Sequence, residues 1–118
     1  LKMIHCLITH RQRRKTAERL NLQPVTELAE TTQIARDLLL AQKTGVHYHI
    51  CHVSTKTSVE LVRMAKARGI NAFEVAPHHI LLTDDDIPKD NGYYKMNPPL
   101  RNKEDQAALL VGLLDGDN

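Results

Sequence analysis

The stretch Tyr48–His49–Ile50–Cys51–His52–Val53–Ser54–Thr55 decides the predicted fold. Its first half is a short run rich in β-forming residues, which is typical of a buried strand. The run closes on His52, and a Ser–Thr pair follows immediately before a helical pattern. Because α/β barrels present metal ligands and catalytic groups from the C-terminal tips of their strands, His52 stands where a functional group is expected.

The same order of strand and then helix repeats along the chain. Periodic apolar residues, glycine stops and a capping-box pattern at Thr57–Ser58–Val59–Glu60 mark the helices. The predicted elements are a strand at Lys2–Ile8, a helix at Thr26–Thr44, a strand at Val46–Cys51, a helix from Thr57 to Arg68, a strand at Ile70–Val75 and a helix from Asn102 to Leu114. The predicted class is therefore α/β, with three consecutive βα units and a parallel sheet.

Three βα units do not close a fold on their own. They fit either a doubly wound sheet or part of an eight-fold (β/α)8 barrel, and alone they would leave two sheet edges and much apolar surface uncovered. The chain begins at Leu1 without an initiator methionine and stops just after a helix. We therefore expect residues 1–118 to be a piece of a larger single domain.

The composition is that of an ordinary globular protein. Of the 118 residues, 42% are hydrophobic and 25% are charged, and the formal net charge is +2. This charge is too small to predict binding to nucleic acid or to an anionic membrane, and no stretch approaches the roughly 18 apolar residues of a membrane span. Cys6 and Cys51 do not form the pattern of a disulfide framework, which favours a reducing, cytoplasmic location.

Two histidines end consecutive predicted strands, His5 the first and His52 the second. Adjacent strand tips in a parallel sheet lie roughly 5 Å apart, so both imidazoles can reach one ion, and imidazole suits zinc. The alternative, in which each is a hydrogen-bonded core histidine, stays open. His47 and His49 lie toward the other end of the second strand and are interpreted as structural.

Further polar groups follow near the same predicted edge. Glu74 lies inside an otherwise apolar strand, which places it either near a site or at a sheet edge, because burying a lone carboxylate is costly. Asn97 precedes two prolines in a long loop, so its amide is held on a rigid backbone that suits hydrogen bonding to a substrate. An ordinary polar loop residue is the alternative. The pair His78–His79, just after the third strand, can help to shape the site.

Four blocks of the chain resemble bacterial class I dihydroorotase. They are Cys51–His52–Val53–Ser54–Thr55, Glu74–Val75–Ala76–Pro77–His78–His79, Lys95–Met96–Asn97–Pro98–Pro99–Leu100–Arg101 and Gly112–Leu113–Leu114–Asp115–Gly116. That family consists of zinc amidohydrolases built on an eight-stranded TIM barrel. The block around Asn97 favours dihydroorotase over allantoinase and hydantoinase, which usually carry serine at that position.

The resemblance implies a partial TIM barrel and a role for several residues. Residues 1–118 would cover strands five to seven, in the C-terminal half of a single amidohydrolase barrel domain, and would lack strands one to four and eight. His5 and His52 would be metal ligands on strands five and six, in a centre with two zinc ions in the whole protein. Asn97 would bind the substrate. The catalytic aspartate would lie beyond residue 118, so the chain alone is expected to be inactive.

The implied reaction is the reversible conversion of N-carbamoyl-L-aspartate to dihydroorotate in pyrimidine biosynthesis, with zinc polarising the amide carbonyl. Two alternatives remain. One is a non-catalytic dihydroorotase-like scaffold bound to aspartate transcarbamoylase, and the other is a different cyclic amidase such as allantoinase or hydantoinase. A homodimer is also compatible with the prediction. After His5 the sequence departs from the family, because Leu7–Ile8–Thr9–His10 replaces the two acidic residues that are usual there.

Overall fold

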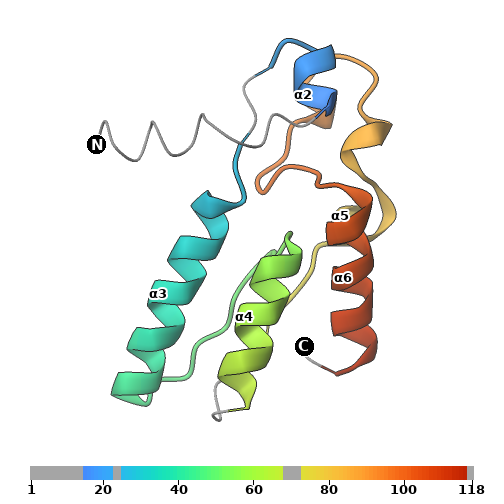
Figure 1. The fold of residues 1–118 in the computed structure, drawn as a ribbon. Coiled ribbons are helices and arrows are strands. Elements are labelled where there is room, and N and C mark those ends of the chain that lie inside the picture. Colours follow the sequence, from blue (N-terminus) through green and yellow to red (C-terminus); the bar gives the residue numbers. More distant parts are fainter. Residues whose placement is uncertain (1–14, 23–24, 68–72, 117–118) are drawn as a thin grey trace, which may run out of the picture.

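The described part of the chain is almost wholly helical. A computed structural model describes residues 15–22, 25–67 and 73–116. Its elements are the α-helices α2 (Lys15–Arg19), α3 (Leu28–Thr44), α4 (Lys56–Lys66), α5 (Pro77–Leu81) and α6 (Lys103–Leu114) and the 3-10 helices η1 (Asp84–Asp86) and η2 (Gly92–Tyr94). Figure 1 shows α3, α4 and α6 side by side in a row, with α2 above the row, beyond the ends of these helices. No helix in these ranges is long and apolar enough to cross a membrane.

Helix α3 forms as its apolar periodicity predicts. Its buried residues recur at intervals of three and four, at Thr31, Ile34, Leu38 and Ala41. The helix ends at Gly45, whose φ of 72° is the left-handed conformation that glycine adopts easily, and the Gly45 amide donates to the Ala41 carbonyl at 2.8 Å. The predicted helix at 26–44 is confirmed, with a start at residue 28.

The start of α4 corrects the predicted capping box. Thr57 is exposed and already helical, whereas the N-cap is Thr55, whose Oγ1 accepts a hydrogen bond from the Ser58 amide at 3.1 Å. Thr55 is fully buried, so its hydroxyl must find a protein partner, and the free amide of the first helical turn supplies one. The helix ends at Lys66, short of the predicted end at Arg68.

The predicted strands are the main difference between the sequence-based expectation and the structure. Within residues 15–22, 25–67 and 73–116 there is no β-strand, and one parallel bridge joins Ile50 to Phe73. Two backbone hydrogen bonds flank it. The Glu74 amide donates to the Ile50 carbonyl at 2.9 Å, and the Val53 amide donates to the Glu74 carbonyl at 3.0 Å.

The parallel order of the two bridged segments agrees with the prediction, but their extent does not. The predicted strand Val46–Cys51 is reduced to the bridge at Ile50. The predicted strand Lys2–Ile8, and residues 70–72 of the predicted strand Ile70–Val75, lie outside the described residues. Among the described residues no third segment pairs with these two, and a two-segment sheet is marginal. The described part of the predicted βα units therefore consists of three helices around one bridge.

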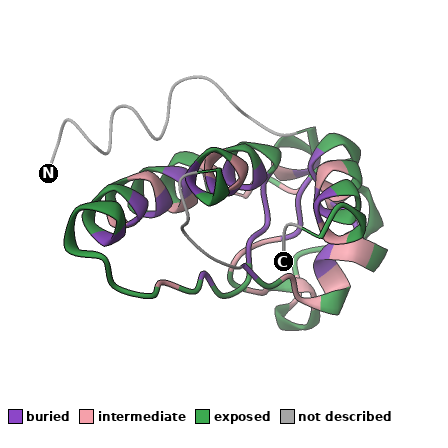
Figure 2. Ribbon diagram, turned by 90° about the horizontal axis from the view of Figure 1, so that it is seen from below, coloured by how far each residue is buried: buried purple, intermediate pink, exposed green. Residues whose placement is uncertain are grey.

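The core lies between the helices and the bridged segments. Its buried apolar residues are Ile34, Leu38, Ala41, Ile50, Val53, Val59, Val62, Ala65, Phe73 and Leu109. Figure 2 shows the buried residues on the inner surfaces of the helices and on the chain between them. Cys51 and Glu74 follow Ile50 and Phe73 and are exposed, because successive side chains of extended backbone point to opposite faces. The bridged segments therefore have one apolar face against the helices and one polar face turned away from them.

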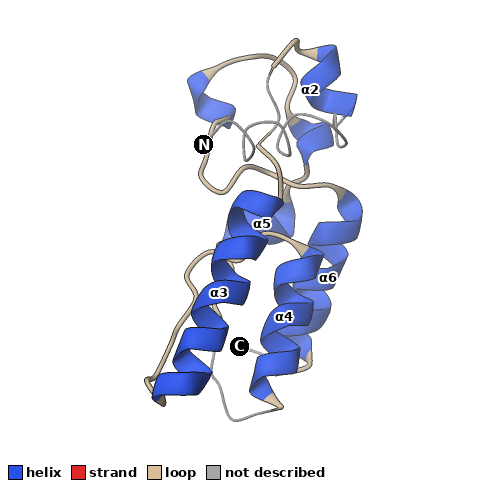
Figure 3. Ribbon diagram, turned by 60° about the vertical axis from the view of Figure 1, so that its left-hand side comes forward, coloured by secondary structure: helices blue, strands red, loops and turns tan. Residues whose placement is uncertain are grey.

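Close packing of α6 on α4 depends on Gly112. A β-carbon at this position would lie 3.1 Å from Val59 Cγ1 and 3.2 Å from Phe73 Cζ, which is tighter than ordinary van der Waals contact. Figure 3 shows the two helices running side by side. The absence of a side chain at Gly112 therefore sets how closely α6 approaches α4 and the bridge.

The loop between α5 and α6 is tied down at both of its ends. The Asp84 amide donates to the Arg101 carbonyl at 2.8 Å, which closes the loop on itself. Thr16 of α2 donates from its Oγ1 to the Asp84 carbonyl at 3.0 Å. At the start of η1, the Thr83 amide donates to Asp86 Oδ2 at 2.7 Å. The loop and α2 therefore form one hydrogen-bonded layer beyond the ends of the long helices.

Adjacent leucines of α6 test where the core lies. Leu109 is 1% exposed and Leu110 is 46% exposed. We expect Leu109→Ala to lower the free energy of unfolding by about 2–5 kcal/mol, because it removes buried methyl groups and leaves a cavity. Leu110→Ala is the matched control and should change it by less than about 0.5 kcal/mol. Urea denaturation of the whole protein measures both, and equal losses would contradict this packing.

Candidate functional site

A cleft of about 450 Å³ brings together three distant parts of the chain. It lies between the first half of α3, the segment from Tyr48 to His52, and the loop from Asn97 to Arg101. Two of the predicted site residues, His52 and Asn97, therefore line the same cleft. The lining also carries a carboxylate, a thiol and a guanidinium, so the cleft offers hydrogen-bond donors and acceptors to a polar ligand.

His52 lies where the bridged segment turns into α4. Its φ is 59°, a left-handed conformation that is uncommon for a residue with a side chain. The side chain is 55% exposed, and its Nδ1 lies 3.1 Å from Glu74 Oε1. This pairing orients the imidazole, because a carboxylate on one ring nitrogen fixes the direction of the other, Nε2. The exposure argues against the core-histidine alternative for His52.

Glu74 stands between two imidazoles. Its Oε1 faces His52, and its Oε2 lies 3.3 Å from His49 Nε2. The sequence left open whether this carboxylate lies near a site or at a sheet edge, and the structure puts it beside His52. Nearly half of the Glu74 side chain is exposed, so the cost of burying a lone carboxylate does not arise here. A carboxylate in this position can orient either ring.

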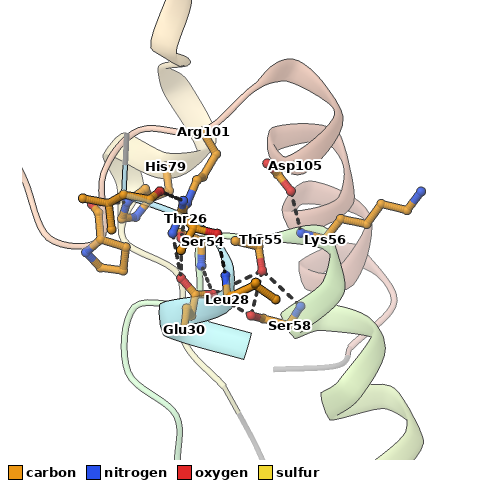
Figure 4. Close-up of polar contacts among 12 residues, drawn as sticks. Thr26, Leu28, Glu30, Ser54, Thr55, Lys56, Ser58, His79, Arg101 and Asp105 are labelled. Carbon is orange, nitrogen blue, oxygen red and sulfur yellow. Dashed lines mark hydrogen bonds and ion pairs between the residues drawn. The ribbon is translucent and has the colours of Figure 1, made fainter. Parts of the chain in front are cut away.

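Glu30 of α3 is the acceptor at the centre of a polar network, which Figure 4 shows in detail. Its Oε1 accepts from the Ser54 amide at 3.0 Å and from Ser58 Oγ at 2.6 Å, and its Oε2 accepts from Ser54 Oγ at 2.5 Å. Thr55 Oγ1 also donates to Oε1 at 3.4 Å. One carboxylate thus fixes the residues that directly follow His52 to α3.

Arg101 completes this network from the other side. Its guanidinium is 3% exposed; its Nε donates to Ser54 Oγ at 3.0 Å and its Nη1 donates to the Val25 carbonyl at 2.9 Å. Its Nη2 lies 3.7 Å from Glu30 Oε2, and the Glu30 side chain is 12% exposed. A buried charge needs both an opposite charge and hydrogen-bond partners, and Arg101 has both. The loop that carries Asn97 is therefore fixed to the segment that carries His52.

A second link joins α4 to α6. Asp105 of α6 is buried, and its Oδ1 accepts from the Lys56 amide at 2.9 Å, at the first residue of α4. The Asp105 amide in turn donates to Asn102 Oδ1 at 2.8 Å, which caps α6. At the surface, Lys56 Nζ lies 2.9 Å from Glu104 Oε1, which raises the pKa of Lys56 and lowers that of Glu104. These contacts hold the starts of both helices together near the cleft.

Asn97 lines the cleft, and a hydrogen bond from α5 fixes the residue after it. Asn97 is exposed, and its peptide bond to Pro98 is cis. The Pro98 carbonyl accepts a hydrogen bond from His79 Nε2 at 3.0 Å. His79 is 3% exposed, and within the described residues its Nδ1 has no hydrogen-bond partner. His79 therefore holds the loop that carries Asn97 in place, and it is not one of the residues that line the cleft.

Burial also sets the charge of His79. Desolvation lowers its pKa below the ordinary value of 6.5, although the hydrogen bond to Pro98 and the charge of Glu30 act in the opposite direction. The neighbouring His78 and Arg101 lower the pKa further. Since Nε2 donates to a carbonyl, a second proton would go to the buried Nδ1, which has no acceptor there. The neutral imidazole is thus the form that this packing favours.

The remaining histidines of the predicted strands divide into two groups. His5, the second predicted metal ligand, lies outside the described residues. His47 is exposed, as is His49, which lines the cleft beside Glu74 and so is nearer to the candidate site than its structural interpretation implied.

Sequence reasoning missed Glu30 altogether and gave Arg101 no role. Glu30 had one detectable signal, because it stands one helical turn before the buried Ile34 on an otherwise core-facing stripe. A carboxylate there requires a partner. Nothing local identified that partner, since Arg101 lies in a loop far along the chain.

Comparisons with known proteins agree with the motifs. Residues 13–58 match the family model described as dihydro-orotase-like. The chain is 94% identical over 103 residues to the dihydroorotase of Lactobacillus acidophilus and 62% identical over 103 residues to that of Lactobacillus leichmannii. The resemblance to dihydroorotase is confirmed. These matches cover 86% of the chain but only 24% of either relative, so this dihydroorotase-like segment spans about a quarter of their length.

The solved structures that the chain resembles are amidohydrolase barrel enzymes. It matches the D-hydantoinase (dihydropyrimidinase) of Thermus sp. with a TM-score of 0.71 and 31% identity, over 79% of the chain and 21% of that protein. The dihydropyrimidinase of Brevibacillus agri matches with a TM-score of 0.74 and 26% identity, also over 79% of the chain and 21% of that protein. The described helices are therefore arranged as in the matching part of these enzymes, although no predicted strand is formed within residues 15–22, 25–67 and 73–116.

The buried charge pair predicts a large effect on stability. Glu30→Gln removes a carboxylate charge beside Arg101, and we expect the free energy of unfolding to fall by about 3–5 kcal/mol, because the buried guanidinium loses the negative charge near its Nη2. Glu60→Gln, on the exposed face of α4, is the matched control and should cost less than about 0.5 kcal/mol. Urea denaturation at neutral pH measures both. Equal, small losses would show that the pair does not stabilise the fold.

The buried imidazole predicts sensitivity to acid. Because the folded pKa of His79 is lowered, the unfolded chain binds the proton more readily, and stability should fall as the pH drops below 6.5. His79→Gln keeps a donor for the Pro98 carbonyl and removes the titration, so its stability should change less between pH 7 and pH 5. Thermal unfolding across this range measures the difference. His47→Gln should retain the acid sensitivity of the wild type, and an unchanged pH profile for His79→Gln would contradict the assignment.

Proposed function

We propose that this chain is part of a dihydroorotase, and that the whole protein interconverts N-carbamoyl-L-aspartate and dihydroorotate in pyrimidine biosynthesis. The observation that carries the proposal is the cleft in which His52 and Asn97 meet. The motif resemblance assigns one of them to the metal and the other to the substrate, and those roles require the two side chains to share a site. The 94% identity to a dihydroorotase supports the same conclusion.

His52 fits a zinc ligand. Its side chain is half-exposed to the cleft, and Glu74 engages Nδ1 and so orients the ring with Nε2 available for an ion. Imidazole nitrogen is a preferred ligand of zinc, and the chemistry that bound zinc supplies is polarisation of the amide carbonyl and activation of water. We assign His5 as the second ligand in this chain, and two zinc ions to the whole protein, on the resemblance alone.

Asn97 fits a substrate-binding residue. A carboxamide offers both a donor and an acceptor, which matches the alternating N–H and C=O groups of a cyclic amide. The loop that carries Asn97 is fixed by the buried Arg101 and by the bond between His79 and the Pro98 carbonyl, so the amide is held in place before substrate arrives. In this proposal the chain positions the substrate and hydrogen-bonds to it. We assign the catalytic aspartate to the part of the protein beyond residue 118.

The likeness to hydantoinases makes another cyclic amidase the second candidate. The solved neighbours are hydantoinases and dihydropyrimidinases, at 24–31% identity for the first three. Both activities use a cyclic amide and a similar site, so the fold does not separate them. The far higher identity to dihydroorotases and the presence of Asn97 favour dihydroorotase. The scaffold alternative, bound to aspartate transcarbamoylase, requires a protein that does not turn over substrate, and the assay below decides it.

Replacing His52 tests the proposal. In the whole protein, His52→Ala should lose zinc at one site and most of the rate of dihydroorotate formation, because the ring that reaches the metal is gone. Zinc quantification and an assay of dihydroorotate formation on the same sample give the result. His47→Ala is the matched control on the same segment and should leave both values near those of the wild type.

Asn97→Ala separates metal binding from substrate binding. This variant should retain its zinc and bind dihydroorotate more weakly, because only the carboxamide at the rim of the cleft is removed. Loss of zinc in Asn97→Ala, or full zinc and full rate in His52→Ala, would refute the assigned roles. A wild-type protein that binds zinc and forms no dihydroorotate from N-carbamoyl-L-aspartate would support the scaffold alternative instead.

A further inference from the structure

A buried histidine holds the residue that directly follows Asn97. His79 of α5 is 3% exposed, and its Nε2 donates to the Pro98 carbonyl at 3.0 Å. Within the described residues, its Nδ1 is buried and has no hydrogen-bond partner. The described residues alone bury this ring, so a longer chain around them can only enclose it further.

The nitrogen without a partner shows that stability alone does not favour a histidine here. A buried polar atom that makes no hydrogen bond is costly, and an apolar ring of similar size would fill the same space without that cost. An apolar ring would not supply the donor at Nε2. The bond from His79 to the Pro98 carbonyl is therefore what the imidazole adds to the packing.

The backbone around the accepting carbonyl is stiff, so the position of His79 is transmitted to Asn97. The ring of Pro98 fixes its own φ, and Pro99 restricts the backbone of Pro98 to extended conformations. Few soft dihedrals therefore separate the Pro98 carbonyl from the backbone of Asn97, and a bond that fixes the first also fixes the second. The other anchor of the loop, Arg101, lies further along the chain.

Both the support and the protonation of His79 suit it to hold the loop. Helix α5 is tied to α6, because Gln106 Nε2 donates to the Ile80 carbonyl at 2.7 Å. Desolvation lowers the pKa of His79, so at neutral pH the ring carries one proton, and the carbonyl partner requires that proton on Nε2. The donor is therefore present at neutral pH and stands on a fixed element.

We infer that His79 is a positioning residue for substrate binding, which acts through Pro98 to set the orientation of the Asn97 carboxamide. The inference rests on the proposed function, in which Asn97 contacts the cyclic amide. His79 is not among the residues that line the cleft, so its effect on the substrate passes through Asn97. Loss of its donor should weaken substrate binding and spare the zinc.

Substitutions at His79 in the whole protein test this role through KM and kcat for dihydroorotate. His79→Phe fills the space without a donor, so KM should rise about tenfold, while zinc content and kcat stay within about twofold of the wild type. His79→Gln returns a donor near the position of Nε2 and should restore KM to within about twofold. His79→Asn, whose amide is too short to reach Pro98, should repeat the rise and replaces His79→Phe if that variant does not fold. His78→Phe, the same change one residue earlier in α5, is the matched control and should leave KM unchanged.

A double substitution separates positioning from general support of the fold. With Asn97→Ala there is no carboxamide left to orient, so adding His79→Phe should raise KM by less than about a further twofold. A full rise in that background, or a His79→Phe protein that loses zinc or kcat as strongly as affinity, would overturn the inference. A wild-type KM in His79→Phe alongside a raised KM in Asn97→Ala would overturn it too, while leaving the proposed function intact. An unchanged KM in Asn97→Ala would refute the proposed role of Asn97 and this inference with it.

Discussion

The buried pair of Glu30 and Arg101 is the interaction on which the rest of the site depends. Each group would be costly alone in a dry environment, and each is satisfied by the other together with Ser54. The three residues come from α3, from the turn before α4 and from the loop before α6. A single cluster of charge and hydroxyl groups thus decides how three separate stretches of chain meet, and both His52 and Asn97 are within a few residues of it.

Local pattern was sufficient for the helices and insufficient for their exact starts. The buried stripe of α3 and its stop at Gly45 can be read from spacing, because helical periodicity and glycine chemistry are both local. The N-cap of α4 cannot be read from spacing. Thr55 and Thr57 are both residue types suited to a helix N-cap, and Thr55 is the one that the fold buries at the start of the helix. Burial depends on tertiary contacts that the motif does not encode.

The extent of the strands was predicted wrongly and the polar network was missed, for related physical reasons. Strand pairing requires neighbours, and the described residues give Ile50 one partner, Phe73. The motif blocks brought His52 and Asn97 to attention as separate features, and the shared cleft now joins them. Glu30 stayed hidden because its partner Arg101 is distant in sequence, and a buried ion pair follows no fixed spacing.

The left-handed backbone of His52 has an energetic consequence for any ligand of this site. An L-residue in that conformation is held at a cost of roughly 1–3 kcal/mol, which the contacts just after it must offset. A ligand that binds the ring only in this conformation adds to the contacts that hold it. An ion that binds only the ordered ring would draw the population toward it, so order at this turn and occupancy of the ring nitrogen are thermodynamically linked. The order of the turn at His52 then depends on the bound ligand as well as on the contacts within the chain.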